Sequence, residues 1–458
     1  MLDKSDIPIA AVMKVFASYG QEAAYIVPTT TGMDKGILDA HGSLRDFFKS
    51  KRIHDFDSQS QGGENKKVVD IYLIEEDSIQ ETRMSLYRPE TKSGDPRLWI
   101  YGLPKYAAPF NLLAFLVLRE KLYLVNASNP NLLGNSSVLF GALKKTEKIT
   151  RPSQQINIQE DLFSHKPEVD PPKPKPISKL NDQIRNPPDT KKITLKAEPL
   201  KELLQSQSNN LDSVESSLVS KLEIISAKGF IDTLRSGDTG VGMTLETLLG
   251  IQANSNRAPD YLGIEIKAKR VTGKQNRTTT RATLFSQVPD WDVSSCRNGM
   301  SILKRHGYID TTTNRLQLYC TNSSTPNPQG LYLKVDEEKN ILESLKKDNE
   351  VVEKVASWRM ANLRAQLEAK HKKTFWVKAK TRASETGTEQ FHYFEVDKTE
   401  SPLSSNLATL IEIGAITMDY TLSQKATGNS ARDHGYLFKI HPENFDLLFP
   451  PSRSIKLS

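Results

Sequence analysis

Cysteine is scarce in this sequence: Cys296 and Cys320 are the only two among 458 residues. Two cysteines cannot build a disulfide framework, and these two do not form the paired motif of a cysteine-based zinc site. The eight histidines are scattered, and His371 and His392 are too widely spaced to indicate a local metal site. These absences exclude a disulfide-stabilised scaffold and a zinc-finger module, and they favour a reducing compartment.

Long apolar runs are also absent. The longest, near Phe110–Leu118, is about half the length that spans a bilayer. The N-terminal residues Met1–Asp6 are polar and lack the apolar core of a signal peptide. We therefore expect a cytoplasmic protein with no membrane partner. The sequence also has no internal repeat and no Walker A loop.

The length of 458 residues indicates two or three domains. Lys and Arg number 62 against 55 Asp and Glu, which gives a formal net charge of +7. A mild basic excess is compatible with a polyanionic partner. It is equally typical of an ordinary basic protein, so charge alone does not identify the partner.

Proline is concentrated in one region, because nine of the 24 prolines fall between Pro152 and Pro199. The densest part is Asp170–Pro176. Proline fixes φ and lacks an N–H, so such a segment cannot join a helix or sheet interior. We predict a Pro/Lys-rich linker over 151–200, with a proline-rich ligand for an aromatic groove as the alternative.

Residues 1–150 alternate apolar runs with polar turns, which predicts an α+β domain. Strands are expected at 68–74, 98–101 and 121–125, and a short helix within 107–118. The segment Tyr87–Arg97 is a basic loop beside aromatic residues. Such a loop can grip phosphates or can simply be solvated.

Residues 201–458 begin with helical periodicity, in which one apolar face recurs from Leu211 to Ile225. A short helix is then expected over Thr244–Leu249, ended by Gly250. Pro259 and Asp260 open a turn, and Gly263–Ala268 reads as a strand.

The strand at 263–268 carries the most informative chemistry. Alternation places Glu265, Lys267 and Lys269 on one face and apolar side chains on the buried face. The turn can fold Asp260 back toward Glu265 at the edge of a sheet. Two carboxylates supply hard oxygen ligands for Mg²⁺, and Lys267 can orient an attacking water. This arrangement predicts hydrolysis of a phosphodiester bond.

Two basic tracts flank these acids, and such tracts fit a nucleic-acid substrate. No Asp or Glu occurs from 266 to 289, nor from 369 to 384. Each tract alone is more typical of a solvated face. The cations of the two tracts are Lys267, Lys269, Arg270, Lys274, Arg277 and Arg281, and then Lys370, Lys372, Lys373, Lys378, Lys380 and Arg382.

The pattern Pro259-Asp260…Glu265-Ile266-Lys267 resembles the PD-(D/E)XK nuclease motif. The longer block Gly240–Lys267 is similar to the MvaI/BcnI restriction endonuclease family, which is related to the mismatch-repair nicking enzyme MutH. Thr283–Phe285 and Arg432–Ile440 also match the family's pattern in the same order. The resemblance covers about 205–450.

The resemblance implies catalytic roles for four residues. Asp260 and Glu265 correspond to the metal-binding acids, with Ile266 as a further metal-binding position, and Lys267 to the catalytic lysine. Glu246 corresponds to a helix-borne acid near the site, although it can equally be a surface charge on its helix.

The resemblance also directs attention to DNA contacts. Lys269 and Arg270 follow the catalytic strand, while Lys425 and Arg432 are candidates for reading guanine. His434 lies in a block that contacts target base pairs in this family, and it can alternatively cap a turn.

The family implies a MutH-like α/β (α+β) fold, with a central mixed sheet in a two-lobed nuclease domain over 201–458. It implies a Mg²⁺-dependent, monomeric type II restriction endonuclease of double-stranded DNA, acting at a short site of the CCNGG type. A cognate DNA methyltransferase and a bacterial or archaeal cytoplasm follow from that role. The alternatives are a MutH-like nickase and a non-catalytic DNA-binding protein.

The N-terminal domain departs from short members of the family, which contain little beyond the nuclease. We interpret 1–150 as a second DNA-binding or effector domain, because tethering raises the effective concentration at a site. A protein-interaction domain is the alternative.

Overall fold

A computed structural model describes residues 9–76, 78–91, 94–118, 120–132, 192–194, 211–251, 259–271, 280–425, 430–449 and 454–457. The chain forms two compact units. The N-terminal unit comprises Met1–Val15, Tyr25–Asp39 and Phe56–Glu202. The C-terminal unit comprises Phe16–Ala24, Ala40–Asp55 and Leu203–Ser458. The proline-rich stretch 170–176 lies outside the described residues.

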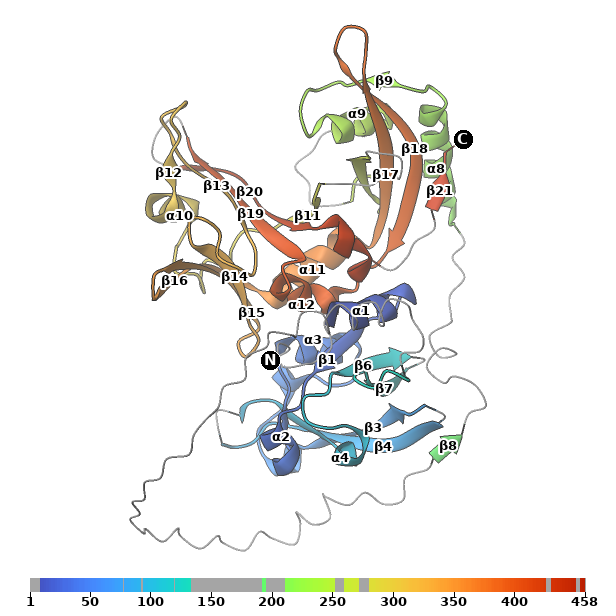
Figure 1. The fold of residues 1–458 in the computed structure, drawn as a ribbon, viewed down its shortest axis with the longest axis vertical. Helices are drawn as coiled ribbons and strands as arrows, with labels where there is room; N and C mark the ends of the chain where they lie inside the picture. Colours follow the sequence, from blue (N-terminus) through green and yellow to red (C-terminus); the bar gives the residue numbers. More distant parts are fainter. Residues whose placement is uncertain are drawn as a thin grey trace, which may run out of the picture. The chain divides into compact units, whose positions relative to one another are not determined.

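The N-terminal unit is built on one mixed sheet, in the order β1-β6-β7-β3-β4-β5-β2, with β8 also paired to β4 (Figure 1). The α+β character expected from the alternating runs is therefore present. The strands are β1 (Ala23–Ile26), β2 (Leu38–Asp39), β3 (Lys67–Ile74), β4 (Ser78–Tyr87), β5 (Arg97–Ile100), β6 (Leu113–Leu118), β7 (Lys121–Asn126) and β8 (Lys192–Thr194). The helices in the first 132 residues are α1 (Ile9–Ser18), α2 (Thr30–Lys35), α3 (Gly42–Ser50) and α4 (Leu103–Tyr106), with 3-10 turns η2 (Phe56–Ser58) and η3 (Gly63–Asn65).

Two expectations for this region are wrong. The helix expected within 107–118 is instead the strand β6, paired along its length with β7. Its six residues are all apolar and nearly all buried, and a fully apolar run carries no periodicity that separates a strand from a helix. Within the region predicted as linker, Lys192–Thr194 forms the strand β8, antiparallel to β4.

The C-terminal unit contains three sheets. The first has the order β10-β17-β18-β21, with β9 paired to β18; the second has the order β11-β20-β19-β13-β12; and the third is β14-β15-β16. The strands are β9 (Ile231–Asp232), β10 (Glu265–Arg270), β11 (Ala282–Ser286), β12 (Tyr308–Ile309), β13 (Leu316–Asn322), β14 (Leu331–Asp336), β15 (Ile341–Asp348), β16 (Val351–Arg359), β17 (Lys373–Ala383), β18 (Glu389–Glu400), β19 (Ile416–Gln424), β20 (Ala431–Ile440) and β21 (Ser454–Lys456). The helices are α8 (Ser213–Ser226), α9 (Gly240–Leu248), α10 (Gly299–His306), α11 (Met360–Lys370) and α12 (Leu407–Glu412), with η5 (Ser404–Asn406) and η6 (Pro442–Leu447).

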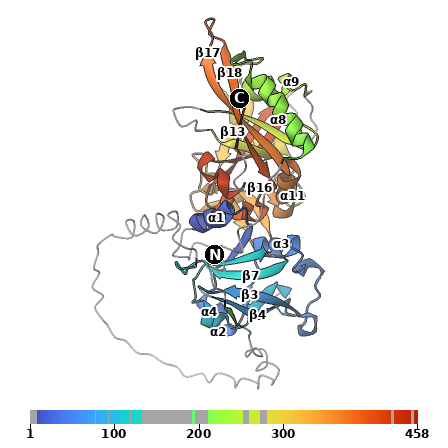
Figure 2. The same ribbon diagram turned by 90° about the vertical axis from the view of Figure 1, so that its right-hand side faces the viewer.

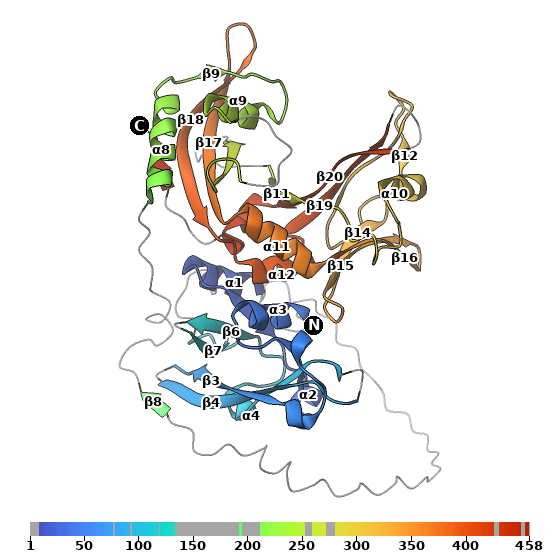
Figure 3. The same cartoon turned by 180° about the vertical axis from the view of Figure 1, so that it is seen from behind.

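The first sheet is mixed, as expected. β10 runs parallel to β17, whereas β17 and β18 are antiparallel. Figure 2 shows α8 and α9 beside this sheet, and Figures 1 and 3 show the first and second sheets as two lobes of the unit with α11 and α12 near their bases. None of the helices in the described part of the chain is long and apolar enough to cross a membrane.

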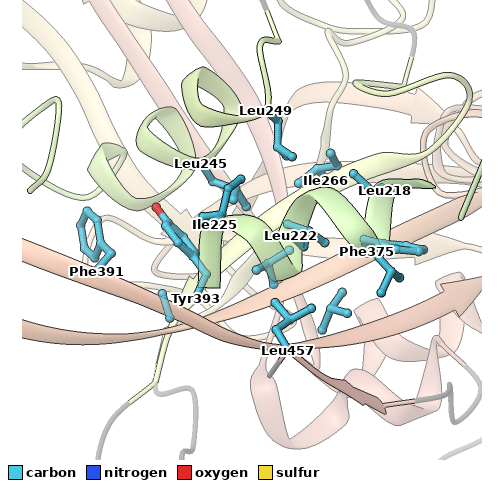
Figure 4. Packing of buried hydrophobic residues seen from close by; sticks show 14 of the residues in the cluster. Leu218, Leu222, Ile225, Leu245, Leu249, Ile266, Phe375, Phe391, Tyr393 and Leu457 are labelled. Atoms are coloured by element: carbon cyan, nitrogen blue, oxygen red, sulfur yellow. The ribbon is translucent and has the colours of Figure 1, made fainter. Parts of the chain in front are cut away.

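The core of the first lobe forms between its two helices and its sheet. Leu218, Leu222 and Ile225 of α8 are buried against β-strand residues such as Phe375 (Figure 4). The apolar face predicted from the sequence is confirmed. α8 begins at a capping box, in which the Asp212 side chain accepts a hydrogen bond from the N–H of Glu215.

The C-terminal unit includes α3, which the sequence analysis assigned to the N-terminal domain. Asp46 of α3 forms an ion pair with Arg364 of α11 and accepts a 2.8 Å hydrogen bond from Asn340. Ser43 donates from its backbone N–H to the Glu337 carboxylate at 3.0 Å. The domain boundary differs from the expectation because these polar partners are distant in sequence. A prediction that treats each domain as one continuous segment cannot anticipate such pairs.

Replacing Asp46 by alanine is expected to lower the free energy of unfolding of the C-terminal unit by about 3 kcal/mol, because the buried Arg364 guanidinium would lose its direct ion pair. The Arg364 side chain is only 8% exposed. Urea unfolding followed by tryptophan fluorescence measures this, since Trp291, Trp358 and Trp376 lie in this unit. Glu353→Ala is the control, because its ion pair with Arg305 is exposed and weak. Equal stability of the two variants would contradict the role given to Asp46.

Candidate active site

The strand β10 holds the residues that the sequence analysis placed at the centre of the site. Ile264 and Ile266 are 2% and 3% exposed and pack in the core, as the alternation predicts. Their packing directs the intervening Glu265 to the other face. Among the described strands, β10 is at the end of its sheet, next to β17.

A tight turn precedes the strand and returns Asp260 to it. The backbone groups of Tyr261 and Ile264 exchange two 2.8 Å hydrogen bonds around the turn. Leu262 and Gly263 both have positive φ, and the conformation of Gly263 at +90° favours glycine. As a result, the Asp260 Oδ2 accepts a 3.0 Å hydrogen bond from the backbone N–H of Ile266. Asp260 thus lies over the start of β10, close in space to Glu265.

The Glu265 carboxylate has no solvent exposure and lies between two lysines. Its Oε1 is 2.6 Å from the Lys267 Nζ on the same strand. Its Oε2 is 3.0 Å from the Nζ of Lys370, the last residue of α11. A buried carboxylate is costly unless cations compensate it, and here each oxygen has one.

Glu246 approaches the same group of charges from α9, which packs against β10. Burial, reinforced first by the charge of Asp260, raises the pKa of the Glu246 carboxyl. Burial, followed by the charge of Glu265, raises the pKa of Asp260, against the opposing effect of the Ile266 N–H. Three carboxyl groups therefore interact through their charges, and Lys267 and Lys370 partly offset their repulsion.

The donor chemistry of this group fits a hard divalent cation. Asp260 and Glu265 offer carboxylate oxygens, and a cation between them would relieve the repulsion that raises the pKa of Asp260. The side chain of Ile266 is in the core, so only its backbone carbonyl is available as a ligand. Among the described residues, no three or more His, Cys, Asp or Glu side chains are arranged as a metal site. The described side chains therefore fit a cation held by two carboxylates, with water or backbone oxygen as the remaining ligands.

The sequence analysis gave no role in the site to two residues that lie near it, Lys370 and His371. Lys370 was noted only within a basic tract, and nothing local in its sequence indicates the contact with Glu265. His371 follows it and is fully buried, with its ring nitrogens 2.9 Å from Thr374 Oγ1 and 2.8 Å from the Leu284 carbonyl oxygen. Burial lowers the pKa of His371 to about 3, so the ring is neutral and structural.

Lys269 and Arg270 are engaged within the protein. The Lys269 Nζ is 3.7 Å from Asp397 and lies over the Phe445 ring. Arg270 donates through Nε and Nη2 to Glu389, at 2.8 and 2.9 Å. Contacts of these two residues with DNA stay a prediction, and any such contact would compete with these pairs.

The second basic tract is partly neutralised: Lys370, Lys373 and Lys378 pair with acids of other elements. Lys378 on β17 pairs with Glu395 and Asp397 on the neighbouring strand β18. Lys373 pairs with Asp212 and Glu215 at the start of α8. The tract itself contains no acids, but acids of other elements lie beside these lysines.

Lys425, Arg432 and His434 lie together on the hairpin of β19 and β20, in the second lobe. All three are exposed. The strands are irregular here, since Gly435 has a φ of +118° and its carbonyl accepts a 2.6 Å hydrogen bond from Thr421. A side chain at Gly435 would approach Leu437 and Ser286 within 2.8 Å. The glycine therefore permits a bulge that orients His434 outward.

The sequence profile of the MvaI/BcnI restriction endonuclease family matches residues 219–449. No curated protein matches the chain.

Two solved structures with which the chain shares 21% identity are those of the restriction endonuclease MvaI. The structure of MvaI in complex with its cognate DNA substrate matches this chain with a TM-score of 0.46. The match covers 54% of this chain and 100% of that one. The structure of MvaI in the absence of DNA matches with a TM-score of 0.34. That match covers 55% of this chain and 100% of the MvaI chain.

The profile match contains β10, its preceding turn, α9 and the β19–β20 hairpin, and it extends over just over half of the 458 residues. The chain therefore belongs to the MvaI/BcnI restriction endonuclease family.

Proposed function

We propose that this chain is a Mg²⁺-dependent, site-specific endonuclease of double-stranded DNA, of the type II restriction class. The observation that carries the proposal is the grouping on β10. Asp260 is held to the backbone of Ile266, next to a buried Glu265 whose oxygen is 2.6 Å from Lys267. These are the acids and the lysine of the motif, brought together by one turn and one strand.

The chemistry assigned to the site is hydrolysis of a phosphodiester bond. A water oxygen attacks phosphorus, the bond to the leaving oxygen on the opposite side breaks, and the leaving oxygen takes up a proton. Lys267 orients the water and contacts the scissile phosphate. Asp260 and Glu265, with the Ile266 carbonyl, are the residues that would hold Mg²⁺, which when bound lowers the pKa of water and offsets charge on the phosphate. Glu246 adds a third carboxyl beside this group.

Lys370 is proposed to position the site. The Lys370 ammonium contacts Oε2 of Glu265, the carboxylate oxygen that Lys267 does not contact. By sharing the carboxylate, Lys370 limits how tightly Glu265 holds Lys267, and so leaves the Lys267 ammonium available to water and phosphate. Because Lys370 ends α11, the same contact fixes the helix to the edge strand β10.

Recognition of the target is assigned to the second lobe. Lys425, Arg432 and His434 present exposed donors on one hairpin, and the major-groove edge of guanine offers two acceptors that suit arginine or lysine. A short C/G-rich site of the CCNGG type is consistent with such readers. The proposed working form is a monomer in a bacterial or archaeal cytoplasm, alongside a methyltransferase that protects the host DNA.

The experiment that tests the function is incubation of the purified full chain with Mg²⁺ and unmethylated supercoiled plasmid. Discrete linear fragments with one repeated sequence at their mapped ends are expected. Open circles alone would instead indicate a strand-nicking enzyme of the MutH kind. Binding of DNA without cleavage in Mg²⁺ or Mn²⁺ would identify a non-catalytic DNA-binding protein.

Substitution of Asp260 or Lys267 by alanine is expected to reduce the cleavage rate by at least about 10³-fold, because transition-state charge stabilisation is lost. Binding of the duplex by these variants should persist, since most of the affinity comes from other phosphate contacts. Single-turnover cleavage and gel-shift titration measure the two quantities. Asp238→Ala is a matched control, because Asp238 is an exposed acid in the same lobe. Wild-type cleavage by Asp260→Ala would refute the site.

Lys370→Ala is expected to lower the single-turnover cleavage rate about 10–100-fold, which corresponds to roughly 1.4–2.7 kcal/mol in the barrier. The concentration of DNA at half-saturation should change little, and Lys370→Arg should recover much of the rate by restoring the positive charge. Lys372→Ala, an exposed lysine two residues away, is the control. Equal effects of Lys370→Ala and Lys372→Ala would show that only net charge matters.

Arg432→Ala is expected to reduce discrimination between the mapped site and a site with one base pair changed by about 5–150-fold, the loss of one bidentate base contact. The ratio of cleavage rates on two matched oligonucleotide duplexes measures this directly. Arg315→Ala, an exposed arginine in the connection between β12 and β13 of the same sheet, should leave the ratio unchanged. An unchanged ratio of cleavage rates in Arg432→Ala would show that Arg432 does not read the target base pair.

A further inference from the structure

The N-terminal unit contains a pocket that the nuclease chemistry does not use. It lies between the β1–α2 connection, α2, β2 and the start of β5, and has a volume of about 170 Å³. Its residues all belong to this unit. Apolar side chains form one part of the wall, and Arg97, Lys35 and two threonines contribute polar groups. The lining is Ile26, Val27, Pro28, Thr29, Thr31, Gly32, Lys35, Ile37, Leu38, Asp39 and Arg97.

Arg97 is the distinctive group of this pocket. Its side chain is only 12% exposed, and its Nε makes no hydrogen bond in the described structure. The nearest carboxylate, Asp39, is 3.9 Å from that Nε and is itself 64% exposed. Tyr87 is the cross-strand neighbour of Arg97 and forms a side-chain hydrogen bond with it. A guanidinium carries five donors, so this arginine has capacity for an anion.

The other polar groups add donors beside Arg97. Thr29 accepts a 3.1 Å hydrogen bond from the N–H of Gly32, which leaves the threonine O–H available to donate. Lys35 is exposed at the end of α2 and adds a second positive charge. A Cβ on Gly32 would lie 2.9 Å from the Ile37 carbonyl oxygen, so glycine keeps this turn close-packed. With Asp39 counted, the pocket carries a net charge of +1.

Arg88, the other arginine of the neighbouring basic loop, is already engaged by the backbone. Arg88 donates from Nε to the Gly94 carbonyl at 2.8 Å and from Nη1 to the Gln59 carbonyl at 3.3 Å. Its guanidinium therefore holds the loop together. Of the two arginines that made Tyr87–Arg97 a candidate phosphate grip, Arg97 is the one that faces a cavity.

We propose that this pocket binds a phosphate group, held by Arg97 with Lys35 and Thr29, and that in the working enzyme it is a backbone phosphate of DNA. The choice of DNA rests on the proposed function of the C-terminal unit. A free nucleotide has the same phosphate chemistry and is the other source. A phosphate contact in the N-terminal unit would give the tethered unit a sequence-independent hold on the substrate.

The test measures DNA binding over a range of salt concentrations in full-length protein carrying Asp260→Ala, so that the duplex is not cut. Adding Arg97→Ala is expected to raise Kd about 5–10-fold and to reduce the slope of log K against log salt by about 0.9, the loss of one phosphate contact. Lys35→Ala should change Kd and the slope in the same direction. Because the Lys35 side chain is exposed, this variant is expected to fold, so its effect cannot be attributed to unfolding. Arg83→Ala, an exposed arginine of β4, removes the same charge outside the pocket and should leave the slope nearly unchanged.

A second arm titrates inorganic phosphate and a deoxynucleoside monophosphate into the protein without DNA, by calorimetry. Loss of this binding in Arg97→Ala with unchanged DNA affinity would retain the phosphate site but overturn DNA as its source. No effect of Arg97→Ala in either arm would overturn the pocket proposal. Failure of the Asp260→Ala protein to bind duplex at all would instead count against the proposed function, and the phosphate arm would still decide the pocket.

Discussion

A fully buried carboxylate between two ammonium groups holds the candidate site together. Glu265 contributes one oxygen to Lys267 and the other to Lys370, so removal of either lysine would leave one buried carboxylate oxygen without a cation. The pair of contacts also joins an edge strand to the end of a helix. The geometry of Asp260, Glu246 and Lys267 is therefore set around this one charge.

Charge compensation from distant elements recurs through the C-terminal unit. Lys378 and Lys269 meet the acids of β18, and Arg281 meets Asp419 of β19 at 2.8 Å. Tracts that are purely basic along the chain thus become mixed surfaces once strands pair. The exposed cations on the β19–β20 hairpin stand apart from this pattern. Their exposure on this hairpin of the second sheet is what makes them suitable readers in the proposed nuclease.

The N-terminal part of the chain contributes to both units. The segments 16–24 and 40–55 belong to the C-terminal unit, where Asp46 forms an ion pair with Arg364 of α11. Because α11 ends at Lys370, this ion pair lies on the helix that supplies one partner of Glu265. The remainder of the first 132 residues forms a separate sheet with its own polar pocket. A nuclease in which the N-terminal sequence both braces the catalytic unit and adds a substrate contact is consistent with these positions.

The amino-acid sequence by itself determined the local features of this protein. The alternation of Ile264, Glu265 and Ile266, the turn at Asp260 and the apolar face of α8 are all short-range patterns, and each appears in the structure as predicted. The family was indicated by the resemblance of longer blocks, Gly240–Lys267, Thr283–Phe285 and Arg432–Ile440, and the family profile confirms it. What could not be derived were pairings across long sequence separations: Lys370 with Glu265, Asp46 with Arg364, and the acids that neutralise the second basic tract. Nor could a uniformly apolar run such as β6 be distinguished from a helix. Only the tertiary structure decided these, because ion pairing and strand pairing depend on distance in space, and a periodic pattern reports only the nearest turns of the chain.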